Sequence, residues 1–440
     1  MKRSILFLIL INLFSSLAAQ YSVSGGSGFP ILAVDTSQYR LQVYLLNGLS
    51  GAQIAYTSSY TETHQWYRYR ESAINAVPVS AVQNGNTSYI TDIQDGYGYF
   101  VGLPTDPRTA YVWIIDYSKY IPRFFNLEPE EDEFECIRLR IWAEVEAEQF
   151  FYYFPSGNRS ELKRTYFLQY NTQEWDEDNQ QFIAKEENKK LTGLISEIEI
   201  DPPPLSDTHF TLTGDQFAEQ FGIQQAIRSD LYRAIAVEAH GTAETNKLHA
   251  DNERHSEGDA LGGSAPIEYT FTAYANEPVA ASYKWEISQW DNNAGKMTTI
   301  VRYTADNILR YNFEKNGIYQ VDLEVRDSRS ICSDSITPFK VMIDSTVVKI
   351  PNAFSPGSSI GVNDELRVSF SSITSFKASV FNSQGNLLFQ WSDPAKGWDG
   401  RVNGRFVPTG VYYVIVEYKD SLGKAKSMSK AVNVLRAINK

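Results

Sequence analysis

Two of the five histidines lie among acidic residues and are the first groups in this chain that could bind a metal ion. His249 and His255 share a short stretch with four carboxylates between positions 251 and 259. Imidazole and carboxylate groups together suit zinc and similar metals. The surrounding residues 241–264 are polar and lack hydrophobic periodicity, which is typical of a linker or long loop. We therefore predict a linker here and no metal site.

A second group with chemical potential is the run Trp175-Asp176-Glu177-Asp178. An aromatic ring beside carboxylates could bind a carbohydrate, and paired carboxylates could hydrolyse one. A solvated connection between two strands explains the same residues more simply, because Asp and Glu are usually exposed. We favour the connection and keep a carboxylate hydrolase within residues 106–240 as the alternative function.

Short catalytic motifs are absent from the whole sequence. There is no His-Glu-x-x-His, no Gly-x-Ser-x-Gly, no phosphate-binding glycine loop and no Cys-x-x-Cys. We therefore predict no catalytic, cofactor-binding or metal-binding residues, no cofactor and no enzymatic activity. An enzyme should instead show a pocket where carboxylates of perturbed pKa converge.

The N-terminus has the pattern of a secretory signal peptide over residues 1–19. Lys2 and Arg3 precede an apolar run from Ile5 to Phe14, and small residues follow at 15–19. No other apolar stretch is long enough for a transmembrane helix, so the mature chain should have none. The two cysteines, Cys136 and Cys332, cannot provide a disulfide framework, and we favour two unpaired buried thiols.

Charge divides the chain into an acidic body and a basic C-terminal part. Residues 349–440 carry a net charge of +6, and residues 1–348 a net charge of −19. Nucleic-acid binding requires clustered basic side chains, so the acidic body argues against a nucleic-acid partner.

Short strands and turn signals indicate an immunoglobulin-like (Ig-like) sandwich over residues 20–105. Trp66 has the position of the buried tryptophan of a third strand, and Tyr99 that of the corner tyrosine. Residues 106–240 read as a second β-rich domain with a short helix at 215–221, for which the sequence suggests no family.

Residues 265–346 form the third β unit. Positions 319, 321, 323 and 325 alternate apolar against polar neighbours, as in a strand with one buried face. We expect Trp285 and Tyr319 to lie in its core. The stretch from Phe313 to Asp327 resembles the end of a polycystic-kidney-disease-type (PKD) domain, an Ig-like sandwich.

Ordered motifs fill the C-terminal residues 349–440. They are Pro-Asn-Ala-Phe-Ser-Pro at 351–356, Asn-Asp at 363–364, Gly-Trp-Asp-Gly at 397–400 and Gly-Val-Tyr at 410–412. Together they resemble the gliding-motility-associated C-terminal domain, the type B sorting signal of the type IX secretion system. The residues that carry this resemblance are Pro351, Asn352, Phe354, Pro356, Asn363, Asp364, Gly397, Trp398, Asp399, Gly400, Gly410 and Tyr412.

The sequence thus predicts an all-β protein of several tandem Ig-like sandwiches with a small C-terminal sorting sandwich. The resemblance implies export by the type IX secretion machinery to the outer-membrane surface or the medium. A surface-displayed row of sandwiches suits a binding or structural role in adhesion or in a surface complex, with a protein or glycan ligand.

Overall fold

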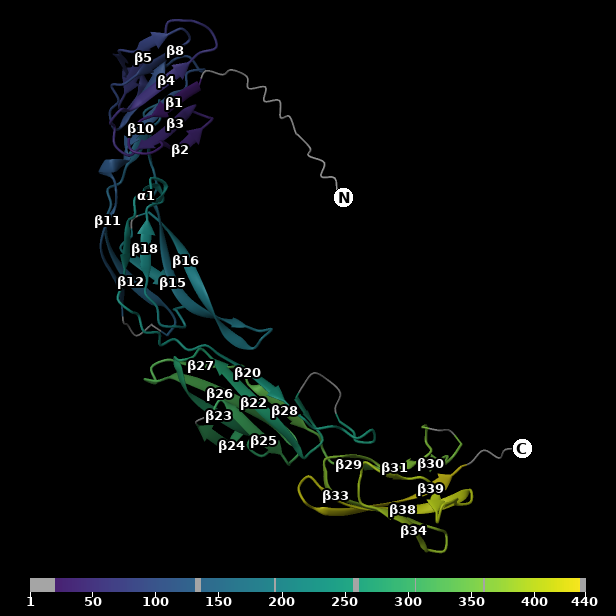
Figure 1. Ribbon diagram of the computed structural model, residues 1–440. Helices are drawn as coiled ribbons and strands as arrows, with labels where there is room; N and C mark the ends of the chain where they lie inside the picture. The colour runs from purple at the N-terminus through teal and green to yellow at the C-terminus, as the bar shows by residue number, and fades with distance from the viewer. Residues whose placement is uncertain are drawn as a thin grey trace, which may run out of the picture. The chain divides into compact units, whose positions relative to one another are not determined.

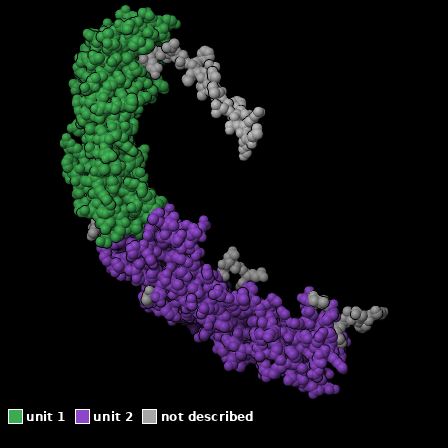
Figure 2. All heavy atoms as spheres, viewed as in Figure 1, with its two compact units in different colours: residues 1–172, 185–233 green, residues 173–184, 234–440 purple. Residues whose placement is uncertain are grey.

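The computed structural model describes residues 20–130, 136–193, 195–255, 261–304, 306–358 and 361–435. The signal peptide expected at 1–19 lies outside these residues. The chain divides into two compact units, residues 1–172 with 185–233, and residues 173–184 with 234–440 (Figure 2). The expected all-β class is confirmed, since strands make up most of the described elements and α1 (Gln216–Gln220) is the one α-helix among them (Figure 1).

Two sheets that share one core form the first sandwich of unit 1. Trp66 and Tyr99 of one sheet pack with Ile54 and Ile90 of the other, all fully or nearly fully buried. The Trp66 Nε1 donates a hydrogen bond to Ser88 Oγ at 2.7 Å, so this indole satisfies its polar group inside the core. The first sheet has the order β1 (Gln20–Ser24), β4 (Gln53–Thr57), β8 (Thr87–Ile90), β7 (Val82–Asn84), and the second the order β2 (Ile31–Thr36), β3 (Leu41–Leu46), β10 (Tyr111–Asp116), β9 (Tyr97–Val101), β5 (Trp66–Tyr69), β6 (Val77–Val79).

Strand β10 is buried on both faces, because the second sheet is covered on each side. Val112 and Ile114 point into the core of the first sandwich. Trp113 and Ile115 belong to a second core that includes Phe150 and other residues of the following region. The two regions of unit 1 are therefore packed together by apolar contacts as well as by chain connection.

The second region of unit 1 contains two further sheets, a hairpin and α1, except that residues 173–184 of one sheet belong to unit 2. The short helix expected at 215–221 is α1, and the Asp215 side chain caps its N-terminus by accepting from the backbone N–H groups of Phe217 and Ala218. The sheets are β11 (Arg123–Glu130), β12 (Leu139–Glu146), β17 (Glu197–Ile200), and β16 (Gln181–Thr192), β15 (Thr165–Asp176), β18 (Thr211–Gly214), β19 (Ala226–Arg228), and the hairpin is β13 (Phe151–Tyr153) with β14 (Arg159–Glu161).

Unit 2 begins with a sandwich whose core holds Trp285 and Tyr319, both almost completely buried. The predicted alternation appears in β26, where positions 319, 321, 323 and 325 are buried and the residues between them are not. Its sheets are β20 (Ala239–Glu244), β22 (Ile267–Ala275), β25 (Ile308–Phe313), and β21 (Leu261–Gly263), β28 (Phe339–Ile343), β26 (Gly317–Asp327), β23 (Ala280–Asp291), β24 (Lys296–Thr304), with β27 (Ser333–Ser335) paired to β26.

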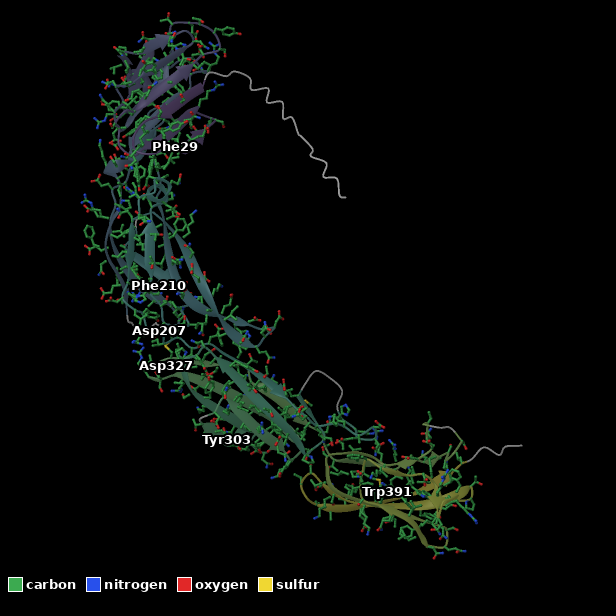
Figure 3. All side chains as sticks on the ribbon, in the orientation of Figure 1. Phe29, Asp207, Phe210, Tyr303, Asp327 and Trp391 are labelled. Atoms are coloured by element: carbon green, nitrogen blue, oxygen red, sulfur yellow. The ribbon has the colours of Figure 1, made fainter. Side chains whose placement is uncertain are left out.

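The C-terminal domain of unit 2 packs a five-stranded sheet against three short strand pairs (Figure 1). Trp391, labelled in Figure 3, lies in this core with its ring 6.1 Å from that of Phe376. The sheet has the order β30 (Ala353–Phe354), β39 (Ala425–Val434), β38 (Gly410–Asp420), β33 (Ile373–Phe381), β34 (Leu387–Trp391), and the pairs are β29 (Val347–Lys349) with β32 (Ser369–Ser371), β31 (Leu366–Arg367) with β35 (Gly397–Trp398), and β36 (Arg401–Val402) with β37 (Arg405–Phe406).

The expectation of two unpaired thiols is wrong. Cys136 and Cys332 are both disulfide-bonded, and neither is a free cysteine. Spacing along the sequence could not show this, because a disulfide depends on distances in the folded chain. Among the residues that the structure describes, no helix has the length and hydrophobicity required to cross a lipid bilayer.

Candidate functional site

The motif residues of the C-terminal domain meet around Trp398. This side chain is completely buried, and its ring lies 5.6 Å from that of Phe354 and 5.9 Å from that of Tyr412. The Trp398 Nε1 donates to the carbonyl of Arg401 at 2.9 Å, and the Tyr412 hydroxyl donates to the carbonyl of Pro408 at 2.9 Å. Three motif positions far apart in sequence therefore build one aromatic core with satisfied polar atoms.

Gly400 shows why one motif position requires glycine. Its φ is +75°, and a Cβ at this position would lie 2.7 Å from Cγ of Pro356. A side chain would thus be strained by the backbone conformation and would also collide with another motif residue. Pro356 and Gly400 form a close contact that brings the chain after β30 against the turn after β35.

The remaining motif residues set turns and strand ends. Asn363 has a φ of +56° and accepts from the backbone N–H of Ser355, and Asp364 Oδ2 accepts from the N–H of Gly361 at 3.0 Å. The carbonyl of Asn352, next to Pro351, accepts from Asn433 N at 2.9 Å, beside the pairing of β30 with β39. Gly397 opens β35, Asp399 Oδ1 accepts from Arg401 N, and Gly410 opens β38. These twelve residues hold the architecture of the domain and do not converge on a reaction centre.

The histidine group has the geometry of a packed segment. The rings of His249 and His255 stack with centroids 4.4 Å apart, and His249 Nδ1 lies 3.4 Å from Glu253 Oε2. Glu253 is already paired with Lys247 at 2.8 Å. The described residues contain no group of three potential metal ligands, and the acidic positions 257 and 259 lie outside them.

Trp175 lies at the end of the β15–β16 hairpin and does not offer an open platform. His240 stacks on its ring at 4.3 Å with an interplanar angle of 5°, and Tyr274 lies 5.4 Å away. Asp176 accepts from both the backbone and the side chain of Asn179, and the side-chain hydrogen bond is the main reason why its pKa is lowered. This carboxylate therefore forms the hairpin turn, while Glu177 and Asp178 are exposed.

Six carboxylates have a pKa shifted away from the range that suits a general acid. Among the described residues, every Asp or Glu with a resolved shift has a lowered pKa, whereas a general acid requires a raised one. In all but Glu253 the main cause is a side-chain hydrogen bond from a cationic or amide group. The residues are Asp106, Asp176, Glu253, Glu286, Glu324 and Asp420.

A cleft in unit 1 was not foreseen from the sequence. It has a volume of about 480 Å³, within the usual range of ligand pockets, and lies beside β9, β10 and β13. Its lining residues come from five separate segments, so no short motif marks it. The polar and aromatic groups on its wall include Arg70, Glu71, Tyr97, Tyr120, Gln149 and Phe151.

Fold and core arrangement define a protein of successive Ig-like β-sandwiches. Comparison with protein families identifies two of its parts: residues 128–229 match a fibronectin type III domain, and residues 348–431 match the CHU_C type IX secretion signal domain. The chain therefore carries a type IX secretion signal, and it is exported to the cell surface or the extracellular space. The fibronectin match lies in the region to which the sequence assigned no family.

Similar solved structures are multidomain proteins with little overall correspondence to this chain. The FN1–FN3 domains of chicken CNTN1 are 10% identical, with 71% of this chain and 98% of that chain covered and a TM-score of 0.25. Three N-terminal domains of the bacteriophage RB49 Hoc protein are 11% identical, covering 73% and 100%, with a TM-score of 0.21. Escherichia coli alpha-2-macroglobulin activated by porcine elastase is 9% identical, covering 96% and 44%, with a TM-score of 0.17. No curated protein matches the chain.

Proposed function

We propose that this protein is a non-enzymatic binding or structural component of the cell surface or the secreted fraction, acting in adhesion or in a surface complex. The observation that carries the proposal is the succession of separate sandwich cores upstream of a secretion signal domain. Fibronectin-type and Ig-like domains with such a signal are typical of non-enzymatic exported proteins. In this arrangement the sandwiches display loops and clefts to a partner.

The cleft in unit 1 is the place where we expect a ligand to bind. It combines the Gln149 amide, the Glu71 carboxylate and the Arg70 guanidinium with aromatic rings. Planar polar groups can bind neighbouring hydroxyl or peptide groups, and aromatic rings contribute apolar contact area. These groups support a glycan or a protein segment as the ligand.

Screening of the mature protein on glycan and protein arrays tests this proposal. Binding should weaken at least tenfold in a Tyr97→Ala, Gln149→Ala double variant, and it should be unchanged in Gln384→Ala, which removes an exposed amide from the C-terminal domain. Turnover of a polysaccharide or peptide that is lost in Asp176→Ala would instead favour the hydrolase.

A further inference from the structure

Residues 247–255, which we call the strap, run between β20 and β21 but contact the C-terminal domain. Glu253 forms a parallel bridge with Phe370 of β32. Phe370 N donates to the Asn252 carbonyl at 3.1 Å, and Arg254 N donates to the Phe370 carbonyl at 2.7 Å. Since β29 pairs with the other edge of β32, the strap acts as the third strand of this small sheet.

The side chain of Asn252 fixes the strap in place. It is 9% exposed, and its Nδ2 donates to the carbonyls of Val368 at 2.8 Å and Pro394 at 2.7 Å. These two acceptors belong to separate segments of the C-terminal domain, before β32 and after β34. One amide group therefore joins both segments to the strap and satisfies their carbonyl groups.

Further contacts hold the strap at Lys247 and Ala250. Ala250 packs against the core of the C-terminal domain. The Lys247 ammonium group forms an ion pair with Glu253 and donates a hydrogen bond to the carbonyl of Ser264. Although burial would raise the pKa of Glu253, hydrogen bonds from Lys247 and Ser264 lower it, so the carboxylate stays charged and holds the lysine.

C-terminal to the strap, two buried serines also connect this part of the chain to the C-terminal domain. Ser372 N donates to Ser264 Oγ at 2.8 Å, and Ala265 N donates to Ser372 Oγ at 2.9 Å. Ser264 and Ser372 are both almost completely buried. The segment that sequence reasoning treated as a linker therefore packs against the C-terminal domain at several points.

We propose that the strap is part of the export signal of this chain, with Asn252 as its positioning residue. The secretion signal domain at 348–431 is then incomplete without residues 247–255, which lie between β20 and β21 of the preceding sandwich. Without the strap, β32 would have an unpaired edge and two buried carbonyl groups would lose their donors, which favours local opening of the domain. The inference rests on the export role of the C-terminal domain and adds a second segment to it.

Variants of the full chain test this inference by hydrogen exchange. Asn252→Ala should speed exchange of the Phe370 amide by roughly tenfold or more, because each unsatisfied buried carbonyl favours opening. Asn252→Asp keeps the size of the side chain but removes both N–H donors, so it should speed exchange of the Phe370 amide to a similar extent. Asp251→Ala is the matched control, since this neighbouring side chain is 91% exposed and its partner Arg367 is itself 41% exposed. Amides of β26 should be unchanged in all three variants, which checks that the protein is folded.

Export in cells that have a type IX secretion system gives the functional result. We expect the surface and secreted fraction of Asn252→Ala to fall several-fold, with Asp251→Ala at the wild-type level. Unchanged exchange at Phe370, or faster exchange with normal export, would overturn the inference. A chain that lacks residues 348–440 should not be exported at all; if it were exported, the export role of the domain would fail, rather than the role of the strap.

Discussion

The C-terminal domain and the fibronectin-type region of unit 1 are both β-sandwiches, but they fix their chains by different interactions. In the C-terminal domain, apolar rings surround Trp398 and a proline packs on the turn at Gly400. In the fibronectin-type region, a buried ion pair joins Arg164 to Asp215, and Asp215 also accepts from the hydroxyl of Tyr117. Arg164 further donates to the carbonyls of Tyr120 and Glu148, both at 2.6 Å.

Because of this difference, we expect the two regions to lose different amounts of stability when one of these residues is replaced. Apolar cores lose stability in proportion to the volume removed, whereas a buried charge becomes strongly unfavourable when its partner is lost. The pKa of Tyr117 reflects this buried environment. Burial is the main cause that raises it, and the negative charge of Asp215 is the second. We therefore expect the charge network to be the more sensitive of the two structures.

Replacement of Arg164 should give the largest effect. In Arg164→Met, Asp215 remains buried with no cation beside it, and the free energy of unfolding of unit 1 should fall by about 3–5 kcal/mol. Urea unfolding of the full chain measures this change. Arg123→Met is the control, because its ion pair with Glu146 is exposed at 3.6 Å and should contribute less than about 1 kcal/mol. Equal losses in the two variants would contradict the role of the network.

Replacement of Gly400 should give an intermediate effect. Gly400→Ala adds a collision with Pro356 to the cost of a positive φ, so the C-terminal domain should lose about 2–4 kcal/mol. Gly404 has a φ of +80°, and a Cβ added there would meet no atom within 4 Å, so Gly404→Ala should cost only about 1–2 kcal/mol. Thermal unfolding followed by tryptophan fluorescence compares them. If Gly404→Ala were the more destabilising change, the close contact with Pro356 would not explain why position 400 requires glycine.

The smallest effect concerns the pH dependence of the first sandwich. Burial lowers the pKa of His64, whose ring nitrogens lie 2.7 Å from Ser88 Oγ and 2.9 Å from Ser58 Oγ. Because the unfolded chain binds the proton more readily, stability should be complete above the unfolded pKa of about 6.5 and should fall as pH drops toward the folded pKa. The slope from this group is at most about 1.4 kcal/mol per pH unit.

Unfolding curves between pH 7.5 and 5 measure this contribution. His64→Gln should flatten the dependence, whereas His255→Gln, which changes an exposed ring, should leave it unaltered. An unchanged slope in His64→Gln would show that another group causes the loss.

Sequence reasoning identified what depends on local pattern. The alternation of β26 and the burial of the tryptophans at 66 and 285 follow from period-two patterning and from the strand positions of these residues. The cleft, the disulfide bonding and the Arg164–Asp215 pair depend on segments that meet only in the folded chain. The kinship of residues 265–346 to PKD domains stays a prediction.

Deletion of residues 348–440 tests the central claim most directly. Surface labelling and cell fractionation should show the truncated chain trapped in the periplasm, while the full chain reaches the surface or the medium. Far-UV circular dichroism of the trapped protein should still show folded β structure, since the upstream sandwiches have their own cores. Normal surface display of the truncated chain would contradict the assignment of the C-terminal domain as the export signal.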